Sequence, residues 1–562
     1  MSDELALESL CVGGQPLIGP FLKRLRVRHF LAEALGPPDP RAKLPPLDSA
    51  MLLLRNFTLS RHPLYGVPEW VRRFDPGLLD LDQDQIRLVN DDRLGRALDK
   101  LFKADLRTLT TRFVIHMVEA FEIDLQRMHN DSTSITFSGD YAPRPPRKDG
   151  RRRLKIVHGF NKDHRPDLKQ LVWSLTVSAD GAVPVHYKVY DGSASDDKTH
   201  IETWEMLRQI HDSPDFLYVA DCKLCTRENM GHIDGAHGRF LTVLPRSRKE
   251  DAVFKKWIVE AEVPWEVIWD RPSLRRTHDA PERFEAIEDP ELSSEGYRIV
   301  WFRSSEKWKR DERTRSHAIR TACREIADVH DRVGKRNLKT QEQVQEAVDT
   351  IIETTKTAAW LQVEVVPRER HTHKQTGPGR PGKNTRYVRK TTVVYEPVVT
   401  QDAESIRASA AADGIFPYIT NVSKEESSPL ELLEIYKYQP FIEKRHEQLK
   451  TAADLTPVNL KTPERIEALL FLYFVATTIH ALLERHVRNC MKARDIRSIP
   501  LYPEERACRA PTADKILGLF ADLRVHRLTD DQRPVKTFWD ELTPVQRTVL
   551  EMLEIPTSAF GQ

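Results

Sequence analysis

Cysteine is scarce in this chain, with 6 residues among 562. That is too few for a disulfide framework, so we expect a reduced, intracellular protein. Cys222 and Cys225 form a CxxC pair, but no second Cys or His pair stands at zinc-finger spacing. The sequence therefore favours neither a disulfide-stabilised secreted protein nor a structural zinc protein.

Long apolar runs are also lacking. The most apolar stretch, residues 468–483, includes His480 and is flanked by charges. It is short for a membrane span, which needs ~20 residues, so we expect a buried core helix there. The first 14 residues are acidic and have no apolar core, which predicts no secretory signal. We expect a cytoplasmic protein that does not enter a membrane.

An excess of charge of one sign is lacking as well. The chain has 86 basic and 84 acidic residues, so only the local distribution of charge is informative. Residues 143–169 carry ten Lys and Arg against three acids, and residues 368–390 carry eight against one. Such clusters suit phosphate contacts and predict binding to double-stranded DNA. The candidate DNA-binding residues in them are Arg151, Arg152, Arg153, Arg380 and Lys383.

The second basic stretch contains GPGRPGK at residues 377–383. It resembles a minor-groove hook, in which Arg-Gly-Arg-Pro is usual, but only Gly-Arg-Pro is present. Two interpretations stay open. Arg380 inserts into a minor groove, or the segment is a basic loop that binds DNA without sequence preference.

Hydrophobic periodicity divides the chain into five segments. Residues 1–122 show apolar residues at spacings of three and four, which predicts a helical domain. Residues 123–245 change to period two and predict strand, strand, strand, helix, strand, helix, strand, which is a mixed α/β sheet. Residues 246–420 mix charged helices and strands as an α+β insertion, residues 421–490 are helical, and residues 491–562 form a C-terminal helical segment.

Two acids stand beside predicted strands. Asp131 lies in MHNDSTSITFSGDY, and Asp221 ends the apolar strand DFLYVAD. An acid at such a strand either makes local backbone bonds or is a metal ligand at the sheet edge where α/β proteins place their chemistry. The residues alone leave both interpretations open for Asp131.

A third acid comes from the helical segment near residue 440. At ~100° per residue, one stripe holds Tyr436, Gln439, Glu443 and Lys450. This stripe is either a solvated helix face or a functional face. Glu447 lies near it too, so spacing alone does not choose between the glutamates. Pro440 begins or kinks the helix, so its phase is reliable only from Glu443 onward.

These residues resemble the DDE transposases of bacterial insertion sequences, in the group with a Tyr-x2-Arg-x3-Glu-x6-Lys signature. Asp131 and Asp221 match the first two acids, and Glu443 matches the third rather than Glu447. Four further stretches resemble the subgroup with a helical N-terminal domain: HPLYGVPEWV, NDDRLGRALDKL, GFNKDHRPDLKQ and ERIEALLFLYFVATTIHALLERHVR. The resemblance spans nearly the whole chain, and the number and order of the motifs make it specific.

The resemblance implies an RNase H-like mixed-sheet catalytic core with a helical N-terminal domain and a large α+β insertion. It implies that Asp131, Asp221 and Glu443 hold two Mg²⁺ ions, which Mn²⁺ can replace. Two such ions promote phosphodiester hydrolysis, after which the freed 3′-hydroxyl joins target DNA. It also implies a homodimer that pairs two element ends, with terminal inverted repeats recognised by the N-terminal domain.

One residue departs from the signature, because Gln439 stands where the group has Arg. In the group, that Arg acts with Tyr436 and Lys450 on a DNA phosphate, and Gln lacks its charge and bidentate fork. Three explanations stay open: the subgroup tolerates Gln, a nearby cation such as Lys444 or Arg445 compensates, or activity is reduced.

Three other functions remain as rivals. An RNase H-like nuclease or resolvase would cut DNA without joining it. A decayed transposase would only bind DNA, and Gln439 is the feature that favours this. A small-molecule metal phosphatase fits the three acids but leaves the basic stretches unexplained.

Overall fold

The computed structural model describes residues 5–137, 139–141, 153–162, 165–271, 281–335, 337–383, 385–455, 460, 462–530 and 533–562. The chain forms two compact units. One combines Met1–Thr242 with Leu433–Gln562, and the other is Val243–Leu432. We refer to them as the core unit and the insertion unit.

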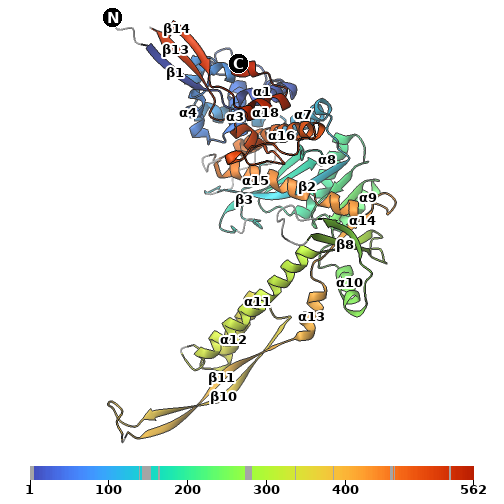
Figure 1. The fold of residues 1–562 in the computed structure, drawn as a ribbon, viewed down its shortest axis with the longest axis vertical. Helices are drawn as coiled ribbons and strands as arrows, with labels where there is room; N and C mark the ends of the chain where they lie inside the picture. The colour runs from blue at the N-terminus through green and yellow to red at the C-terminus, as the bar shows by residue number, and fades with distance from the viewer. Residues whose placement is uncertain are drawn as a thin grey trace. The chain divides into compact units, whose positions relative to one another are not determined.

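The N-terminal part of the core unit is mainly helical (Figure 1). Helix α6 shows why: the Asn90 side chain accepts from the Arg93 amide at its start, while Leu94, Leu98 and Leu101 are buried along one face. The elements are β1 (Leu5–Cys11), α1 (Gln15–Arg24), α2 (Val27–Leu35), α3 (Pro46–Leu59), η1 (Leu64–Gly66), α4 (Val67–Arg72), η2 (Pro76–Leu79), α5 (Gln83–Leu88), α6 (Asp91–Lys103) and α7 (Leu106–Phe121).

Helix α16 (Pro463–Ala493) contains the most apolar run and packs against α1, α3 and α6. Within the described ranges it alone is long and apolar enough to cross a membrane, and 89% of its most apolar window is buried inside the protein. The prediction of a buried core helix at residues 468–483 is therefore confirmed.

The sheet of the core unit has the strand order β4-β3-β2-β5-β6. Strands β2, β3 and β4 are antiparallel neighbours, whereas β5 and β6 run parallel to β2. The elements are β2 (Arg127–Phe137), β3 (Lys169–Ser178), β4 (Pro184–Asp191), η3 (Asp196–Lys198), α8 (His200–His211), β5 (Leu217–Val219), α9 (Arg227–Gly235) and β6 (Arg239–Val243). The predicted order of strands and helices is confirmed, and this large mixed sheet fits an RNase H-like core.

Two helices, not one, span the segment near residue 440. Helix α14 (Pro429–Tyr436) ends before α15 (Gln439–Leu455) begins. Helix α15 lies against β2 and β3. The break falls at Lys437 and Tyr438, so the helical phase does not extend from Glu443 back to Tyr436. Gln439, Ile442, His446 and Leu449 form the buried side of α15, and Glu443 lies on its exposed side.

The insertion unit combines an antiparallel group of strands, in the order β12-β9-β8-β7, with a separate two-stranded ribbon, β10-β11. Helices α11 and α12 pack on the ribbon. The elements are α10 (Lys249–Glu260), β7 (Glu266–Arg271), β8 (Glu282–Glu288), β9 (Arg298–Ser304), α11 (Ser305–Arg332), α12 (Gln341–Thr355), β10 (Leu361–Gln375), β11 (Tyr387–Gln401), α13 (Ala403–Ala411) and β12 (Ile415–Thr420).

The two ends of the chain form a small sheet in the order β1-β13-β14. Strand β1 pairs with β13 over the register Leu5↔Asp530 to Cys11↔Arg524. The expectation of purely helical segments at 1–122 and 491–562 was therefore wrong at these strands. The C-terminal elements are η4 (Pro503–Glu505), α17 (Ala513–Gly518), β13 (Arg524–Asp530), β14 (Arg533–Trp539), α18 (Pro544–Met552) and η5 (Thr557–Phe560).

Candidate active site

Asp131 lies on β2, between β3 and β5 in the sheet. Its Oδ1 accepts a hydrogen bond from the Ser132 amide at 2.8 Å. The local backbone bond expected of a strand-edge acid is thus present. The side chain still keeps 21% of its surface exposed, so it can meet a further partner.

Asp221 follows β5, and the sheet register brings it to the same edge as Asp131. Strands β2 and β5 pair in parallel with His129↔Val219, so continuing the register by two residues sets Asp221 level with Asp131. Burial raises the pKa of the Asp221 carboxyl, and the negative charge of Asp131 raises it further, against a hydrogen bond from the Lys223 amide. Two carboxylates therefore share this edge at an electrostatic cost.

Glu443 projects from the exposed side of α15. Partial burial raises the pKa of its carboxyl, and the charges of Asp131 and Glu447 raise it further. The pKa of Tyr436 is raised by burial and by the charges of the same acids, Asp221, Asp131 and Glu443 among them. The fold thus brings the three predicted acids into one electrostatic neighbourhood.

Lys162 is a neighbour of Asp131. From the sequence it was identified only as one of the cations in the basic stretch 143–169. Its Nζ lies 3.6 Å from Asp131 Oδ1 and donates to Ser132 O at 2.5 Å and Ser132 Oγ at 3.0 Å. It partly neutralises Asp131. Its place in GFNKDHRPDLKQ, one of the resembling stretches, is the signal that could have singled it out.

His446 is a second neighbour of Asp131 that was not predicted from the sequence. It lies on the buried side of α15. Its Nε2 is 3.6 Å from Asp131 Oδ2. Burial lowers the pKa of His446 to about 3, and the charges of Lys162 and Lys450 act in the same direction. The imidazole is therefore neutral at pH 7, and its approach to Asp131 is not an ion pair. The sequence signal that could have identified His446 is its spacing from Gln439 and Ile442, which puts the three residues on one side of the helix.

Gln439 does not face solvent, although we predicted it to contact DNA. The residue is 8% exposed. Its Oε1 accepts from His129 Nδ1 at 2.9 Å, and its Nε2 donates to Asn130 O at 2.9 Å. Burial lowers the pKa of His129 to about 4, so this ring is neutral at pH 7. Gln439 therefore links α15 to β2 beside Asp131, and its predicted contact with DNA stays a prediction.

Arg445, one of the two cations suggested to compensate for Gln439, is buried and already has partners within the protein. Arg445 is 3% exposed, forms an ion pair with Glu484 at 2.9 Å, and donates to the carbonyls of Gly181 and Ala182. Lys444 is exposed on α15, with its Nζ 5.0 Å from the centre of the Phe441 ring. Of the two suggested cations, only Lys444 can reach DNA.

The remaining predicted DNA-binding residues fall into three groups. Lys450 is half-buried on α15, and Arg153 donates to Glu464 Oε1 at 2.8 Å. Arg380 and Lys383 are exposed in the insertion unit. Arg151 and Arg152 lie outside the described residues.

The donor chemistry of the three acids suits Mg²⁺, which prefers oxygen ligands and keeps several waters. Burial raises the pKa of Asp221 and Glu443, and the charge of Asp131 raises both further, so a bound cation would stabilise the ionised forms of these acids. In the described part of the chain, no three His, Cys, Asp or Glu side chains stand close enough to hold an ion. The acids therefore fit a cation in type and charge, and its coordination geometry is not formed.

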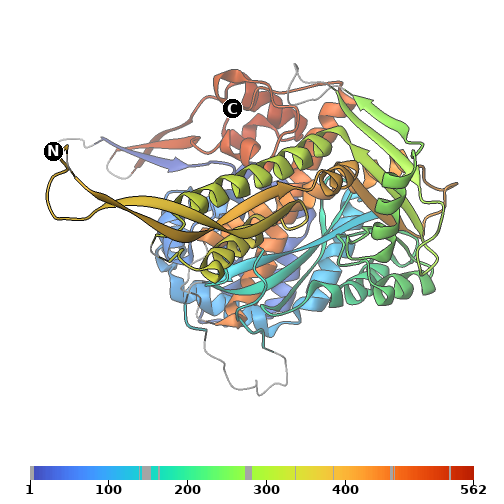
Figure 2. The same cartoon turned by 90° about the horizontal axis from the view of Figure 1, so that it is seen from below.

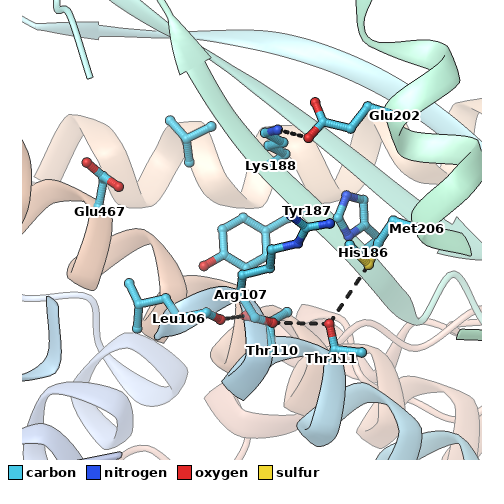
Figure 3. A pocket seen from close by; sticks show the side chains of 11 residues that line it. Leu106, Arg107, Thr110, Thr111, His186, Tyr187, Lys188, Glu202, Met206 and Glu467 are labelled. Atoms are coloured by element: carbon cyan, nitrogen blue, oxygen red, sulfur yellow. Dashed lines mark hydrogen bonds and ion pairs between the residues drawn. The ribbon is translucent and has the colours of Figure 1, made fainter. Parts of the chain in front are cut away.

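A separate cavity of about 220 Å³ lies among α7, β4, α8 and α16 (Figure 3). Tyr187 lines it and stacks on Trp173 with ring centres 4.6 Å apart. Lys188 and Glu202, also in its wall, form an ion pair. None of the three acids lines this cavity, so it is not part of the candidate site.

Comparison with protein families gives one match, to the family described as a transposase DDE domain, over residues 130–479. This range covers more than half of the chain. It begins beside Asp131 and includes Asp221, Glu443 and the whole insertion unit. No curated protein matches the chain.

Proposed function

We propose, on the premise that this chain belongs to the transposase DDE domain family, that it cleaves the ends of a bacterial insertion sequence and joins them to target DNA. Two observations support the proposal: the strand register brings Asp131 and Asp221 level at one sheet edge, and the charge of Asp131 adds to burial in raising the pKa of both Asp221 and Glu443. The family generally uses divalent metal ions and acts on DNA.

Asp131, Asp221 and Glu443 are the residues that would hold Mg²⁺ or Mn²⁺. When bound, such ions would activate the attacking oxygen and stabilise the charge that develops on the leaving oxygen. Asp131 and Asp221 contribute from adjacent strands, which fixes their backbones, while Glu443 contributes from α15. Gln439 and His129 hold that helix to β2, and Lys162 limits the local negative charge near Asp131.

The reaction has two balanced steps. In the first, water attacks the phosphorus at the element end, a P–O bond breaks, and the 3′-oxygen leaves as a hydroxyl. In the second, this 3′-hydroxyl attacks a phosphodiester of target DNA. The new P–O bond replaces the one that breaks, and a 3′-hydroxyl is released from the target. We assign Tyr436 and Lys450 to contacts with the DNA phosphate near the cut.

The other parts of the chain take supporting roles in this proposal. The N-terminal helices recognise the terminal inverted repeats, and two copies of the chain pair the two element ends. Arg153 and the basic insertion residues Arg380 and Lys383 contribute DNA contacts. The insertion interrupts the catalytic core between Asp221 and Glu443, at residues 246–420, as the family resemblance implies.

The test uses purified full-length protein, Mg²⁺ and labelled DNA that carries the element's own ends. Variants Asp131→Asn, Asp221→Asn and Glu443→Gln each remove one acid without changing side-chain size. Glu447→Gln is the matched control, because it removes a carboxylate from the same exposed side of α15.

The proposal predicts cleavage and joining by the wild type and by Glu447→Gln, and neither by the other three variants. Cleavage without joining would identify a nuclease. DNA binding without cleavage in Mg²⁺ or Mn²⁺ would identify a decayed transposase, and full activity of Glu443→Gln would reject the assignment of this acid.

A further inference from the structure

The distal half of the β10–β11 ribbon has no protein cover in the described part of the insertion unit. Strands β10 and β11 pair without interruption from Leu361↔Gln401 to Gln375↔Tyr387. The proximal half packs on α11 and α12 through the buried residues Val329, Val333, Val344, Val348, Val365 and Val394. Beyond the pair Arg368↔Val394, seven further pairs follow, and none of their side chains is buried.

These seven pairs extend the ribbon by about 23 Å at ~3.3 Å per residue. Figures 1 and 2 show the hairpin continuing past α11 and α12 to its tip. A two-stranded ribbon is marginally stable in water by itself. We therefore expect an uncovered ribbon of this length to bind a partner.

The charge of the distal ribbon identifies that partner as a polyanion. Arg370 pairs with Glu396, and the stretch 368–390 contains one acid, Glu369. The other cations are exposed and have no ion-pair partner among the described residues: Arg368, Lys374, Arg380, Lys383, Arg386, Arg389 and Lys390. Their mutual repulsion is relieved by phosphates.

The cations occupy both faces of the ribbon. The register pairs Thr372 with Lys390 and His373 with Arg389. Lys374 is two residues from Thr372, so Lys374 and Lys390 share one face, while Arg389 lies on the opposite face. A ribbon lying flat on DNA would need cations on one face only. Cations on both faces suit a site with phosphates on both sides.

The strands are joined by residues 376–386, and hydrogen bonds tie the described part of this connection to the end of the ribbon. Gln375 Nε2 donates to the carbonyls of Gly377 at 2.8 Å and Gly379 at 3.0 Å. Gly379 has φ of +127°, which favours glycine. The strands are paired without interruption up to Gln375↔Tyr387, so the whole distal ribbon, and not only Arg380, is available to contact a partner.

We propose that the distal β10–β11 ribbon enters the major groove of double-stranded DNA, with each cationic face toward one of the two phosphate backbones. The major groove is about 12 Å wide and admits a two-stranded ribbon as it stands, whereas the minor groove of undeformed B-DNA, at about 6 Å, would have to be widened first. This inference rests on the proposed function, which supplies the DNA. It differs from a minor-groove hook, in which only Arg380 would be inserted.

The test compares two triple variants of the full-length protein. The first, Lys374→Gln with Arg389→Gln and Lys390→Gln, removes cations from both faces of the ribbon. The matched control, Arg313→Gln with Arg320→Gln and Arg324→Gln, removes the same charge from exposed positions of α11. Circular dichroism verifies that both are folded. Affinity for element-end DNA is measured against salt concentration, and dimethyl sulfate protection is mapped at guanine N7 and adenine N3.

The ribbon variant is expected to lower the slope of log affinity against log salt by about 2.7, since each lost phosphate contact contributes ~0.9. It should also lose protection of guanine N7, which faces the major groove. An unchanged slope, an equal change in the α11 control, or loss of adenine N3 protection instead would overturn the inference. Wild-type cleavage of the same DNA is scored separately. Ribbon-dependent binding without cleavage rejects the proposed function alone, and cleavage without ribbon dependence rejects this inference alone.

Discussion

Replacement of Gln439 by methionine tests whether this residue holds the catalytic helix to the sheet. Methionine keeps the length of the side chain but removes both hydrogen bonds, to His129 Nδ1 and to Asn130 O. Because the residue is 8% exposed, water cannot replace the lost partners fully. Each of the two buried groups left unsatisfied costs about 1–3 kcal/mol, so we expect a loss of about 2–6 kcal/mol in the free energy of unfolding.

The same replacement should also slow cleavage. Glu443 lies four residues after Gln439, which is one helical turn and about 6 Å along the axis. A helix end released from β2 displaces that carboxylate, and a misplacement of about 1 Å can cost about 100-fold in rate. Urea denaturation and single-turnover cleavage measure the two effects.

Lys444→Met is the matched control, because Lys444 is exposed on the same helix, and it should change stability by less than about 0.5 kcal/mol. A Gln439→Met protein as stable as the wild type would refute the reasoning. Gln439→Arg restores the residue of the signature but buries a cation beside the neutral His129, so it should destabilise the protein and leave cleavage no faster. Faster cleavage would show that Gln439 reduces activity.

Three further predictions follow from the same contacts. Arg445→Met leaves the buried Glu484 carboxylate without its closest cation, and urea denaturation should show a loss of about 3–5 kcal/mol; a loss below about 1 kcal/mol would contradict the assigned pair. Asp221 has a raised pKa, so its ionised form opposes folding above that pKa. Asp221→Asn should therefore unfold at a higher urea concentration than the wild type at pH 7. This difference in urea concentration should shrink as the pH falls through the raised pKa towards 3.8. A difference that grows on acidification would contradict the prediction. Asp131→Asn should lower the single-turnover cleavage rate by roughly 10³-fold or more, because several kcal/mol of charge stabilisation is lost; a loss of less than tenfold would exclude it from the site.

The sheet of the core unit was predictable because its signals are local. Strands β3 and β4 place apolar residues at alternate positions, and β2 does so at Ile135 and Phe137. Strand β5 is a short buried run with an acid just beyond it. A buried strand followed by an acid places that acid at a sheet edge whatever the rest of the fold. The residues around Asp221 are therefore enough to single it out.

The small terminal sheet could not be predicted, because its pairing is long-range. Strand β1 meets β13 more than 500 residues later, with Ser9 opposite His526. Strand β1 reads LALESLC and is mainly apolar without alternation, and β13 reads RVHRLTD and is largely polar, so neither gives a strong period of two by itself. The partner supplies the stability, and the partner is not visible in a local window.

The role of Gln439 was missed for a different reason. The break between α14 and α15 changes the phase, so a stripe drawn from Tyr436 to Lys450 joined residues of different surroundings. A buried amide also looks the same in sequence as an exposed one. Only its partners on β2, His129 and Asn130, show that it positions the helix.

The most direct test of the account is a joining assay with DNA ends that already carry a free 3′-hydroxyl. It removes the cleavage step and asks whether Asp131, Asp221 and Glu443 support strand transfer to a target plasmid in Mg²⁺. The account predicts joining by the wild type and by Glu447→Gln, and none by Glu443→Gln. Joining that persists in Glu443→Gln, or a wild type that cleaves its ends but never joins them, would contradict it.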